Sequence, residues 1–141
     1  MADQFQKVAV HSLIKNGDRY LVIRRSQLND WKPGEWDTPG GEVEFGELNP
    51  KEALAREVFE ETGLKVRIGK LLHLYSSQSN PSRHQFQFVY ECEYVDGEVK
   101  LNPEEHDEFR WVRPDEMEKM PLIAYLRSFY EEELKSLNYF R

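Results

Sequence analysis

Three glutamates near the middle of the chain, Glu57, Glu60 and Glu61, have a spacing that could bind a metal ion. Positions i, i+3 and i+4 share one face of an α-helix, because the helix repeats every 3.6 residues. Like charges at this spacing repel and cost a helix about 0.2–0.5 kcal/mol per pair. A divalent cation removes that repulsion, and Mg²⁺ prefers oxygen ligands and commonly also takes substrate phosphates. The alternative interpretation is an ordinary solvated face of a glutamate-rich helix.

The residues that flank the glutamates favour the metal site. Pro39-Gly40-Gly41 precedes the segment and predicts a turn, and Gly46-Glu47 lies within it. Asn49-Pro50 fits an N-cap followed by the first helical residue, and Gly63 fits a helix stop. We therefore expect a helix over residues 50–62, with its start and end both specified by the sequence.

The whole stretch, GEVEFGELNPKEALAREVFEETGL from Gly41 to Leu64, resembles the signature of the Nudix (MutT-like) hydrolases. The family pattern is G-x5-E-x7-R-E-U-x-E-E-x-G-U, where U is a bulky apolar residue. Nine positions match it: Gly41, Glu47, Arg56, Glu57, Val58, Glu60, Glu61, Gly63 and Leu64. The departure is one extra residue between Glu47 and Arg56, which we expect in the loop at Leu48-Asn49-Pro50.

The resemblance implies a hydrolase that needs Mg²⁺, or Mn²⁺, which favours the same ligands. It implies that Glu57, Glu60 and Glu61 bind the metal, and that Glu57 is also a candidate general base. The backbone carbonyl of Gly40 would be a further ligand, since glycine leaves it unshielded. Glu47 would act as an outer ligand through water, and the insertion puts its position in question.

Arg56 and the acids outside the signature have two interpretations each. By resemblance, Arg56 forms an ion pair that orients Glu47 or Glu57; the alternative is an ordinary i, i+4 pair with Glu52. Relatives often supply another ligand or base from the loop before the last strand, where Glu105 and Glu108 are our candidates. A solvated acidic loop is the alternative for both.

Contacts to a substrate are harder to assign. Arg25 ends the second strand, where similar hydrolases bind a phosphate or sugar, and surface solvation is its alternative. Asp37 could read the edge of a base or cap the turn that follows it. Aromatic side chains are usually core residues. The candidates for stacking on a base are Trp36, Phe86 and Phe88.

The other patterns predict the elements that position these residues. Strands are expected at residues 7–14, 19–23, 35–38, 64–76, 84–95, 98–101 and 108–112. The Asn16-Gly17 pair predicts a hairpin turn, and residues 78–83 and 102–107 predict loops. A short helix is expected at 114–117 and an amphipathic helix at 122–137. Strands around an inserted helix fit an α/β or α+β fold, and the resemblance implies an α/β/α sandwich with a mixed sheet.

Length and composition limit the class of protein. The 141 residues suit a single domain, residues 1–141, and no apolar run is long enough for a membrane helix. A net charge of −7 argues against a nucleic-acid polymer as partner. The lone cysteine, Cys92, excludes an internal disulfide and suggests a cytoplasmic setting with a structural thiol. The resemblance also allows a homodimer.

The expected reaction is cleavage of a nucleoside diphosphate linked to another group X. Nucleoside triphosphates giving a monophosphate and pyrophosphate are the leading substrates. The alternatives are an ADP-ribose or nucleotide-sugar pyrophosphatase, a non-catalytic nucleotide sensor that would have lost the glutamates, and a structural protein with an acidic helix.

Overall fold

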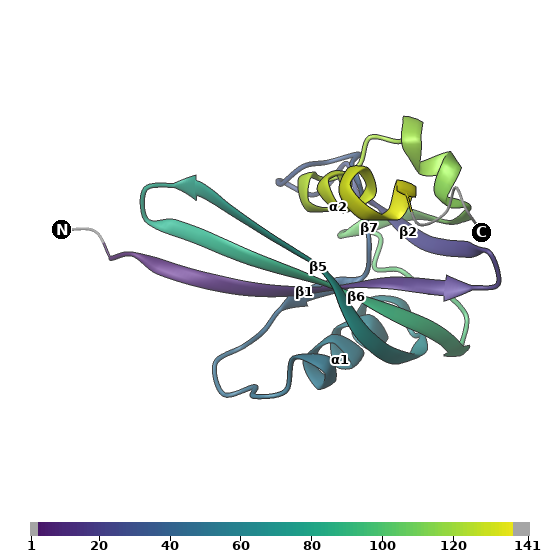
Figure 1. The fold of residues 1–141 in the computed structure, drawn as a ribbon, viewed down its shortest axis with the longest axis horizontal. Helices are drawn as coiled ribbons and strands as arrows, with labels where there is room; N and C mark the ends of the chain where they lie inside the picture. Colours follow the sequence, from purple (N-terminus) through teal and green to yellow (C-terminus); the bar gives the residue numbers. More distant parts are fainter. Residues whose placement is uncertain (1–2, 137–141) are drawn as a thin grey trace.

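A computed structural model describes residues 3–136, in which one mixed β-sheet lies between helices (Figure 1). The sheet follows the order β3-β2-β1-β6-β5, with β4 paired to β1 and β7 paired to β2. The strands are β1 Phe5–Asn16, β2 Arg19–Arg25, β3 Trp36–Asp37, β4 Gly40–Glu42, β5 Lys65–Asn80, β6 Arg83–Asp96 and β7 His106–Val112. The helices are α1 Pro50–Thr62 and α2 Ala124–Phe129, with a 3₁₀-helix at Pro114–Lys119 and a π-helical turn at Tyr130–Leu134.

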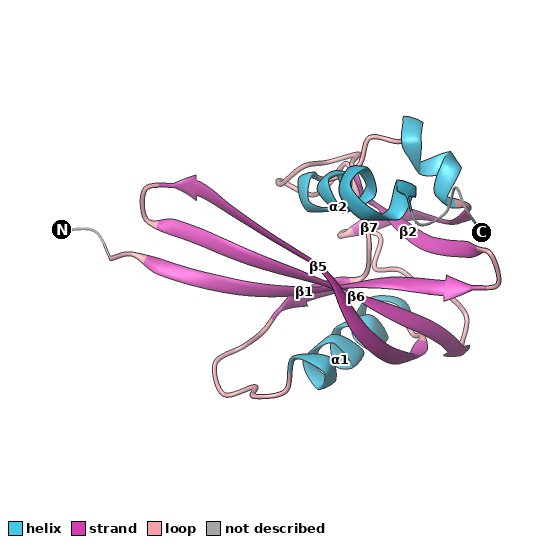
Figure 2. Ribbon diagram, in the orientation of Figure 1, coloured by secondary structure: helices cyan, strands magenta, loops and turns pink. Residues whose placement is uncertain are grey.

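The sheet is mixed because β1 runs parallel to β6, from Phe5 beside Arg83 to Lys15 beside Glu93, whereas its other pairings are antiparallel. Alternate residues of β1 point to opposite faces. Val10 and Ile14 pack in the cluster that α1 covers, and Leu13 packs in the cluster that α2 covers. The two helices thus cover opposite faces, which confirms the predicted sandwich (Figure 2).

Helix α1 has the bounds that its capping residues predict. The side chain of Asn49 accepts hydrogen bonds from the backbone nitrogens of Lys51 and Glu52, at 3.0 and 3.3 Å. Gly63 adopts a left-handed conformation with φ of +78°, which glycine tolerates without strain. Ala53, Leu54 and Val58 form the buried side of the helix. That burial fixes which side of α1 remains for its glutamates.

Three predicted segments differ in the structure. Strand β5 continues to Asn80. The side chain of Asn80 accepts a hydrogen bond from the backbone N–H of Ser82 at 2.9 Å. A tight turn therefore replaces the predicted loop at 78–83. Residues 98–101 are not a strand, because Lys100 donates its backbone N–H to Thr62 at the end of α1. Gly40 and Gly41 are not a turn but part of β4, paired with β1.

The C-terminal helix is shorter and less regular than its amphipathic pattern predicts. Leu122 forms an isolated bridge with Trp36, and α2 begins only at Ala124. The helix passes into the π-helical turn after Phe129. Leu137, the last residue of the predicted helix, lies outside the described residues. Among residues 3–136, no helix is long and apolar enough to cross a membrane.

Candidate functional site

Two of the three candidate metal ligands of α1, Glu57 and Glu61, lie against the short strand β4. The backbone N–H of Gly40 donates to Oε1 of Glu61 at 3.3 Å. The carboxylate of Glu57 packs directly on Gly41, where an added Cβ would lie 2.5 Å from its Cδ. Because Glu57 and Glu61 are four residues apart, both side chains project from α1 toward the same strand. Glycine at position 41 leaves the space that the Glu57 carboxylate occupies.

Burial favours the protonated form of both carboxyls. Burial and, to a lesser extent, the nearby negative charge of Asp37 raise the pKa of Glu61 to about 9. Burial also raises the pKa of Glu57, against the opposing effect of the Arg56 guanidinium. A cation placed between such groups would favour their ionised forms. The pair therefore has the electrostatics of a cation site.

Arg56 connects the remaining acids of the site. Its Nε and Nη2 donate to the two carboxylate oxygens of Glu47, at 3.2 and 3.0 Å. Its Nη2 also lies 3.2 Å from Oε1 of Glu57, and its Nη1 donates to Glu60 at 3.1 Å. The guanidinium thus contacts three carboxylates, and its i, i+4 partner is Glu60, not the Glu52 of the alternative interpretation.

Glu60 differs from the other two helix glutamates, because its side chain is 58% exposed and pairs with Arg56. The described part of the chain contains no group of three or more histidine, cysteine, aspartate or glutamate side chains arranged to hold a metal ion. Two carboxylates and the Gly40 backbone are nevertheless the oxygen donors that Mg²⁺ prefers, so the residues present fit the ion.

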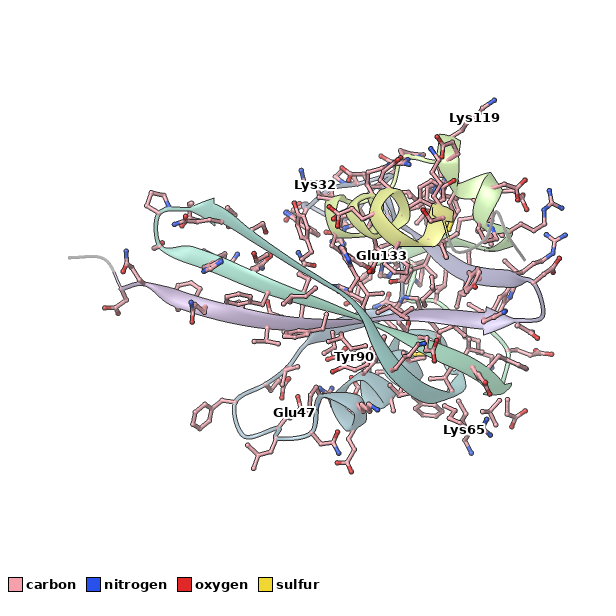
Figure 3. The ribbon with its side chains drawn as sticks, in the orientation of Figure 1. Lys32, Glu47, Lys65, Tyr90, Lys119 and Glu133 are labelled. Carbon is pink, nitrogen blue, oxygen red and sulfur yellow. The ribbon has the colours of Figure 1, made fainter. Side chains whose placement is uncertain are left out.

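The one-residue insertion does not separate Glu47 from the helix. Glu47 accepts the backbone N–H of Glu44 at 2.9 Å, and this bond, with the Arg56 pair, lowers the pKa of Glu47. Leu48 is 94% exposed, so the loop accommodates its extra length by pointing away from the core. Figure 3 shows Glu47 beside α1, on the loop that leads into the helix.

The two acids proposed from outside the signature lie in different surroundings. Glu105 is close enough to Glu61 for its charge to raise the pKa of that group. Glu108 instead pairs with Arg24 and Arg110, each at 3.1 Å. This placement favours Glu105 and turns Glu108 away from the site, a correction that the strand pattern alone did not provide.

Arg25 and Asp37 lie together near Glu61, whose pKa the charge of Asp37 helps to raise. Nη1 of Arg25 is 3.7 Å from Oδ2 of Asp37, and both side chains are largely buried. The Arg25 guanidinium also lies 4.7 Å from the ring of Trp31 and donates through Nε to the Trp31 carbonyl. Asp37 accepts the backbone N–H of Thr38 at 2.7 Å. Trp31 is 52% exposed, so its ring is accessible beside this pair.

Trp36 is a core residue, contrary to our expectation of a base contact. It is only 4% exposed and packs in the cluster that α2 covers. Arg24 and Arg110 lie over its ring, at 5.9 and 4.9 Å from the centroid. Burial and these two guanidinium groups leave the indole unable to stack on a nucleotide base.

Phe88 lies on the face of the sheet that α1 covers, because it packs against the cluster there, and Phe86 follows on the same face by strand alternation. Phe88 lines an open groove together with residues of the loop before α1, including Phe45 and Glu47. Arg25 and Asp37 do not line this groove.

Several buried polar residues near the site gave no sequence signal. His11 and His106 each have one ring nitrogen without a hydrogen-bond partner in the described structure, and burial lowers the pKa of both. Tyr125 reaches Asp37 from α2. Isolated histidines and tyrosines in apolar patterns resemble ordinary core residues, so only the three-dimensional arrangement identifies them.

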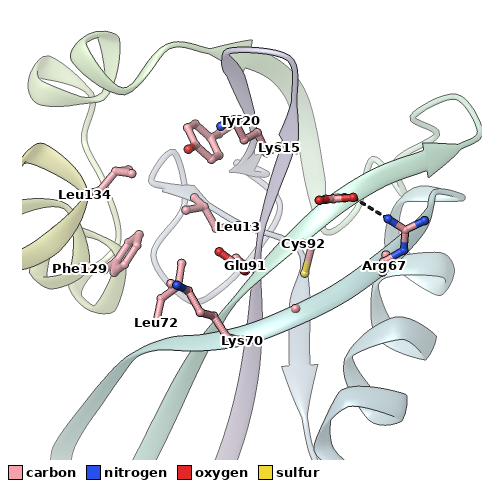
Figure 4. Close-up of a pocket in the computed structure, with 12 residues that line it drawn as sticks. Leu13, Lys15, Tyr20, Arg67, Lys70, Leu72, Glu91, Cys92, Phe129 and Leu134 are labelled. Atoms are coloured by element: carbon pink, nitrogen blue, oxygen red, sulfur yellow. Dashed lines mark hydrogen bonds and ion pairs between the residues drawn. The ribbon is translucent and has the colours of Figure 1, made fainter. Parts of the chain in front are cut away.

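A separate pocket of about 280 Å³ lies between the sheet and the C-terminal helical segment (Figure 4). Leu13, Phe129 and Leu134 line its apolar side, and Arg67 and Glu93 form an ion pair of 2.7 Å at its edge. Cys92 also borders it, and burial raises the pKa of its thiol to about 12, in keeping with the expected structural role. The helix glutamates lie outside this pocket.

Comparisons with known proteins agree with the geometry. A family model described as the NUDIX domain matches residues 5–132. A MutT-like protein of Streptomyces ambofaciens is 33% identical, over 82% of this chain and 69% of its own. The nucleoside triphosphatase NudI of Escherichia fergusonii is 28% identical over 86% and 92% of the two chains. The crystal structure of a MutT protein from Methanosarcina mazei Go1 superposes with a TM-score of 0.82 and 31% identity, covering 98% and 99%.

Proposed function

The chain belongs to the NUDIX family of pyrophosphohydrolases, and we propose that it is a Mg²⁺-dependent enzyme that hydrolyses nucleoside triphosphates to a monophosphate and pyrophosphate. The observation that carries this proposal is the pair of carboxylates, Glu57 and Glu61, held against Gly40 and Gly41. Burial raises the pKa values of both groups, and a bound cation would stabilise their ionised forms. Mn²⁺ fits the same donors.

The metal-binding role falls to Glu57, Glu61 and the Gly40 carbonyl, with Glu60 and Glu105 beside them. A bound divalent cation lowers the pKa of a coordinated water and neutralises charge on the phosphates. Glu47 acts at longer range, because Arg56 engages both of its carboxylate oxygens. Residues that orient ligands in this way commonly matter for metal affinity.

Glu57 is the residue that we assign to accept the proton from the attacking water. Its Oε1 pairs with Arg56 at 3.2 Å, which leaves Oε2 for the proton. Burial raises its pKa, which brings the carboxylate closer to the range useful for a general base near neutral pH. The water oxygen adds to phosphorus and the phosphoanhydride P–O bond breaks, so one water is consumed, a monophosphate and pyrophosphate leave, and Glu57 then releases the proton to solvent.

Arg25 is the candidate for contact with substrate phosphate or sugar, and Asp37 for contact with a base. They lie 3.7 Å apart, and the exposed ring of Trp31 adjoins Arg25. Phe86 and Phe88 remain candidates on the face that α1 covers. The nucleoside triphosphatase and MutT names of the relatives support a triphosphate substrate.

The decisive experiment is product analysis with purified protein, Mg²⁺ and a panel of nucleoside triphosphates, nucleotide sugars and ADP-ribose. We expect pyrophosphate and a monophosphate in equal amounts from at least one triphosphate. Two monophosphates from ADP-ribose would contradict the proposal and favour the pyrophosphatase alternative. Mg²⁺ binding without turnover of any compound would favour a nucleotide sensor.

The acid outside the helix has a separate test. Glu105→Gln should lower kcat about tenfold or more, because Glu105 adjoins Glu61. Glu108→Gln makes the same chemical change on a side chain that pairs with Arg24 and Arg110, and we expect it to change kcat by less than about twofold, since such half-exposed pairs contribute little. Equal losses from the two variants would contradict the assignment of Glu105.

A further inference from the structure

The hydroxyl of Tyr125 meets the residues that lead into Gly40. Tyr125 lies on α2 and is 2% exposed. Its hydroxyl donates a short hydrogen bond to Oδ1 of Asp37. The same oxygen lies 2.8 Å from Oγ1 of Thr38 and accepts the backbone N–H of Thr38 at 3.3 Å. One buried hydroxyl thus contacts two consecutive residues, only two positions before the proposed metal ligand.

The ring of Tyr125 contacts the strand on which Gly40 lies. It stacks on His11, with ring centroids 3.7 Å apart and an interplanar angle of 18°. His11 is the β1 residue paired with Gly40, and its Nε2 is 2.9 Å from the side chain of Gln87. Gly40 is so close to β1 that an added Cβ would lie 2.1 Å from the carbonyl oxygen of Val10. Tyr125 therefore contacts both the chain before Gly40 and its strand partner.

We propose that Tyr125 is a positioning residue that holds the backbone of Gly40 in place for metal binding by Glu61. Strand β4 is three residues long and pairs with β1 over three positions, so its own hydrogen bonds fix it weakly. The carboxylates come from α1 on one face of the sheet, whereas Tyr125 comes from α2 on the other. The C-terminal helix thereby becomes part of the support of the site. The metal in this inference comes from the proposed function, whereas the support of Gly40 by Tyr125 does not depend on it.

Tyr130 supplies a matched control for removing the Tyr125 hydroxyl. It follows in the same C-terminal helical segment and is also 2% exposed. Its hydroxyl hydrogen-bonds to Glu118, which lowers the pKa of that carboxyl. Tyr130→Phe therefore deletes a buried hydroxyl whose hydrogen-bond partner, Glu118, lies in the 3₁₀-helix and not in the segment around Gly40.

The first measurement is amide hydrogen exchange of the metal-free protein, which tests the positioning without metal or substrate. In Tyr125→Phe we expect the amides of Gly40 and Ser12 to exchange several-fold faster relative to the slowest amides of the core. The N–H of Ser12 donates to the carbonyl of Pro39 at 2.9 Å, so it reports on the same segment. Tyr130→Phe should leave both amides unchanged on that scale. Unchanged Gly40 and Ser12 exchange in Tyr125→Phe would overturn the proposal.

The second measurement is Mg²⁺ binding, followed by the rise in Tm on titration and by the Mg²⁺ concentration for half-maximal turnover. Tyr125→Phe should weaken Mg²⁺ about tenfold, a size typical of residues that orient metal ligands. Thr38→Val should act in the same direction, and the double variant should be no worse than Tyr125→Phe alone. A variant that only lowers Tm, with Mg²⁺ affinity intact, would refute the positioning role. Failure of the wild-type protein to bind Mg²⁺ would instead refute the proposed function. The hydrogen-exchange measurement would still test whether Tyr125 holds the backbone of Gly40.

Discussion

Replacing Glu61 by Gln is expected to stabilise the metal-free protein and abolish its response to Mg²⁺. The carboxyl of Glu61 is more deeply buried than that of Glu57, and its Oε1 accepts the N–H of Gly40. Glutamine keeps the shape of the side chain and an oxygen that can accept the same bond. The substitution therefore removes the titratable proton while the local contacts remain.

The size of the effect follows from the pKa of Glu61, which is about 9 in the folded protein and 4.5 in its ordinary state. Because the folded pKa is raised, the stability associated with this carboxyl is fully present below pH 4.5 and is lost progressively as the pH rises to about 9. Each pH unit in that window lowers the free energy of unfolding by about 1.4 kcal/mol. At pH 7 the loss is about 3 kcal/mol, on the order of 5–10 °C in Tm, which Glu61→Gln should recover.

The assay is thermal unfolding in the presence of EDTA at pH 5, 7 and 8.5, followed by titration with Mg²⁺ at pH 7. The excess stability of Glu61→Gln should be small at pH 5 and grow with pH. Wild-type protein should gain Tm with Mg²⁺ by mass action, and the variant should not. Glu52→Gln is the control, since Glu52 is an exposed glutamate on the same helix. Parallel pH profiles for wild type and Glu61→Gln, or an equal Mg²⁺ response, would refute the reasoning.

Two further substitutions test the parts of the site around Glu61. Gly41→Ala places a Cβ 2.5 Å from the carboxylate carbon of Glu57 and should lower kcat/KM about tenfold or more with little change in circular dichroism; full activity would show that Glu57 is free to move. Arg56→Lys loses the two-pronged contact with Glu47 and should weaken Mg²⁺ about 10- to 100-fold in a turnover assay with varied Mg²⁺. Unchanged Mg²⁺ dependence would mean that a simple positive charge at this position is sufficient.

Local sequence rules predicted the parts of the molecule whose cause is local. The helix α1 has the predicted bounds because Asn49 and Gly63 satisfy its ends. The hairpin between β1 and β2 follows from Asn16-Gly17, where Gly17 has φ of +65°. The glutamates followed from helical spacing and from the resemblance. In each case the determining residues lie within a few positions of the feature that they produce.

Features that depend on distant contacts could not be predicted in this way. Gly40 and Gly41 looked like a turn, because a sequence does not reveal that β1 lies close enough to pair with them. Trp36 was predicted to contact a base, because the sequence does not reveal that two arginines and the core cover its ring. Glu105 and Glu108 have the same chemistry in the sequence and differ only in the partners that the fold brings to them.

The placement of the glutamates also explains why a helix can carry so much negative charge beside a core. Arg56 neutralises the outer acids Glu47 and Glu60, whereas Glu61 is partnered by a backbone N–H alone. With a pKa of about 9, Glu61 therefore keeps its proton at neutral pH in the metal-free protein. A divalent cation that reaches Glu61 favours the ionised carboxylate and displaces this proton, so the buried acid becomes a ligand when the cation binds. A second arginine placed beside Glu61 would stabilise the metal-free fold and compete with the metal, so the lack of full compensation at this one carboxylate is what the proposed activity requires.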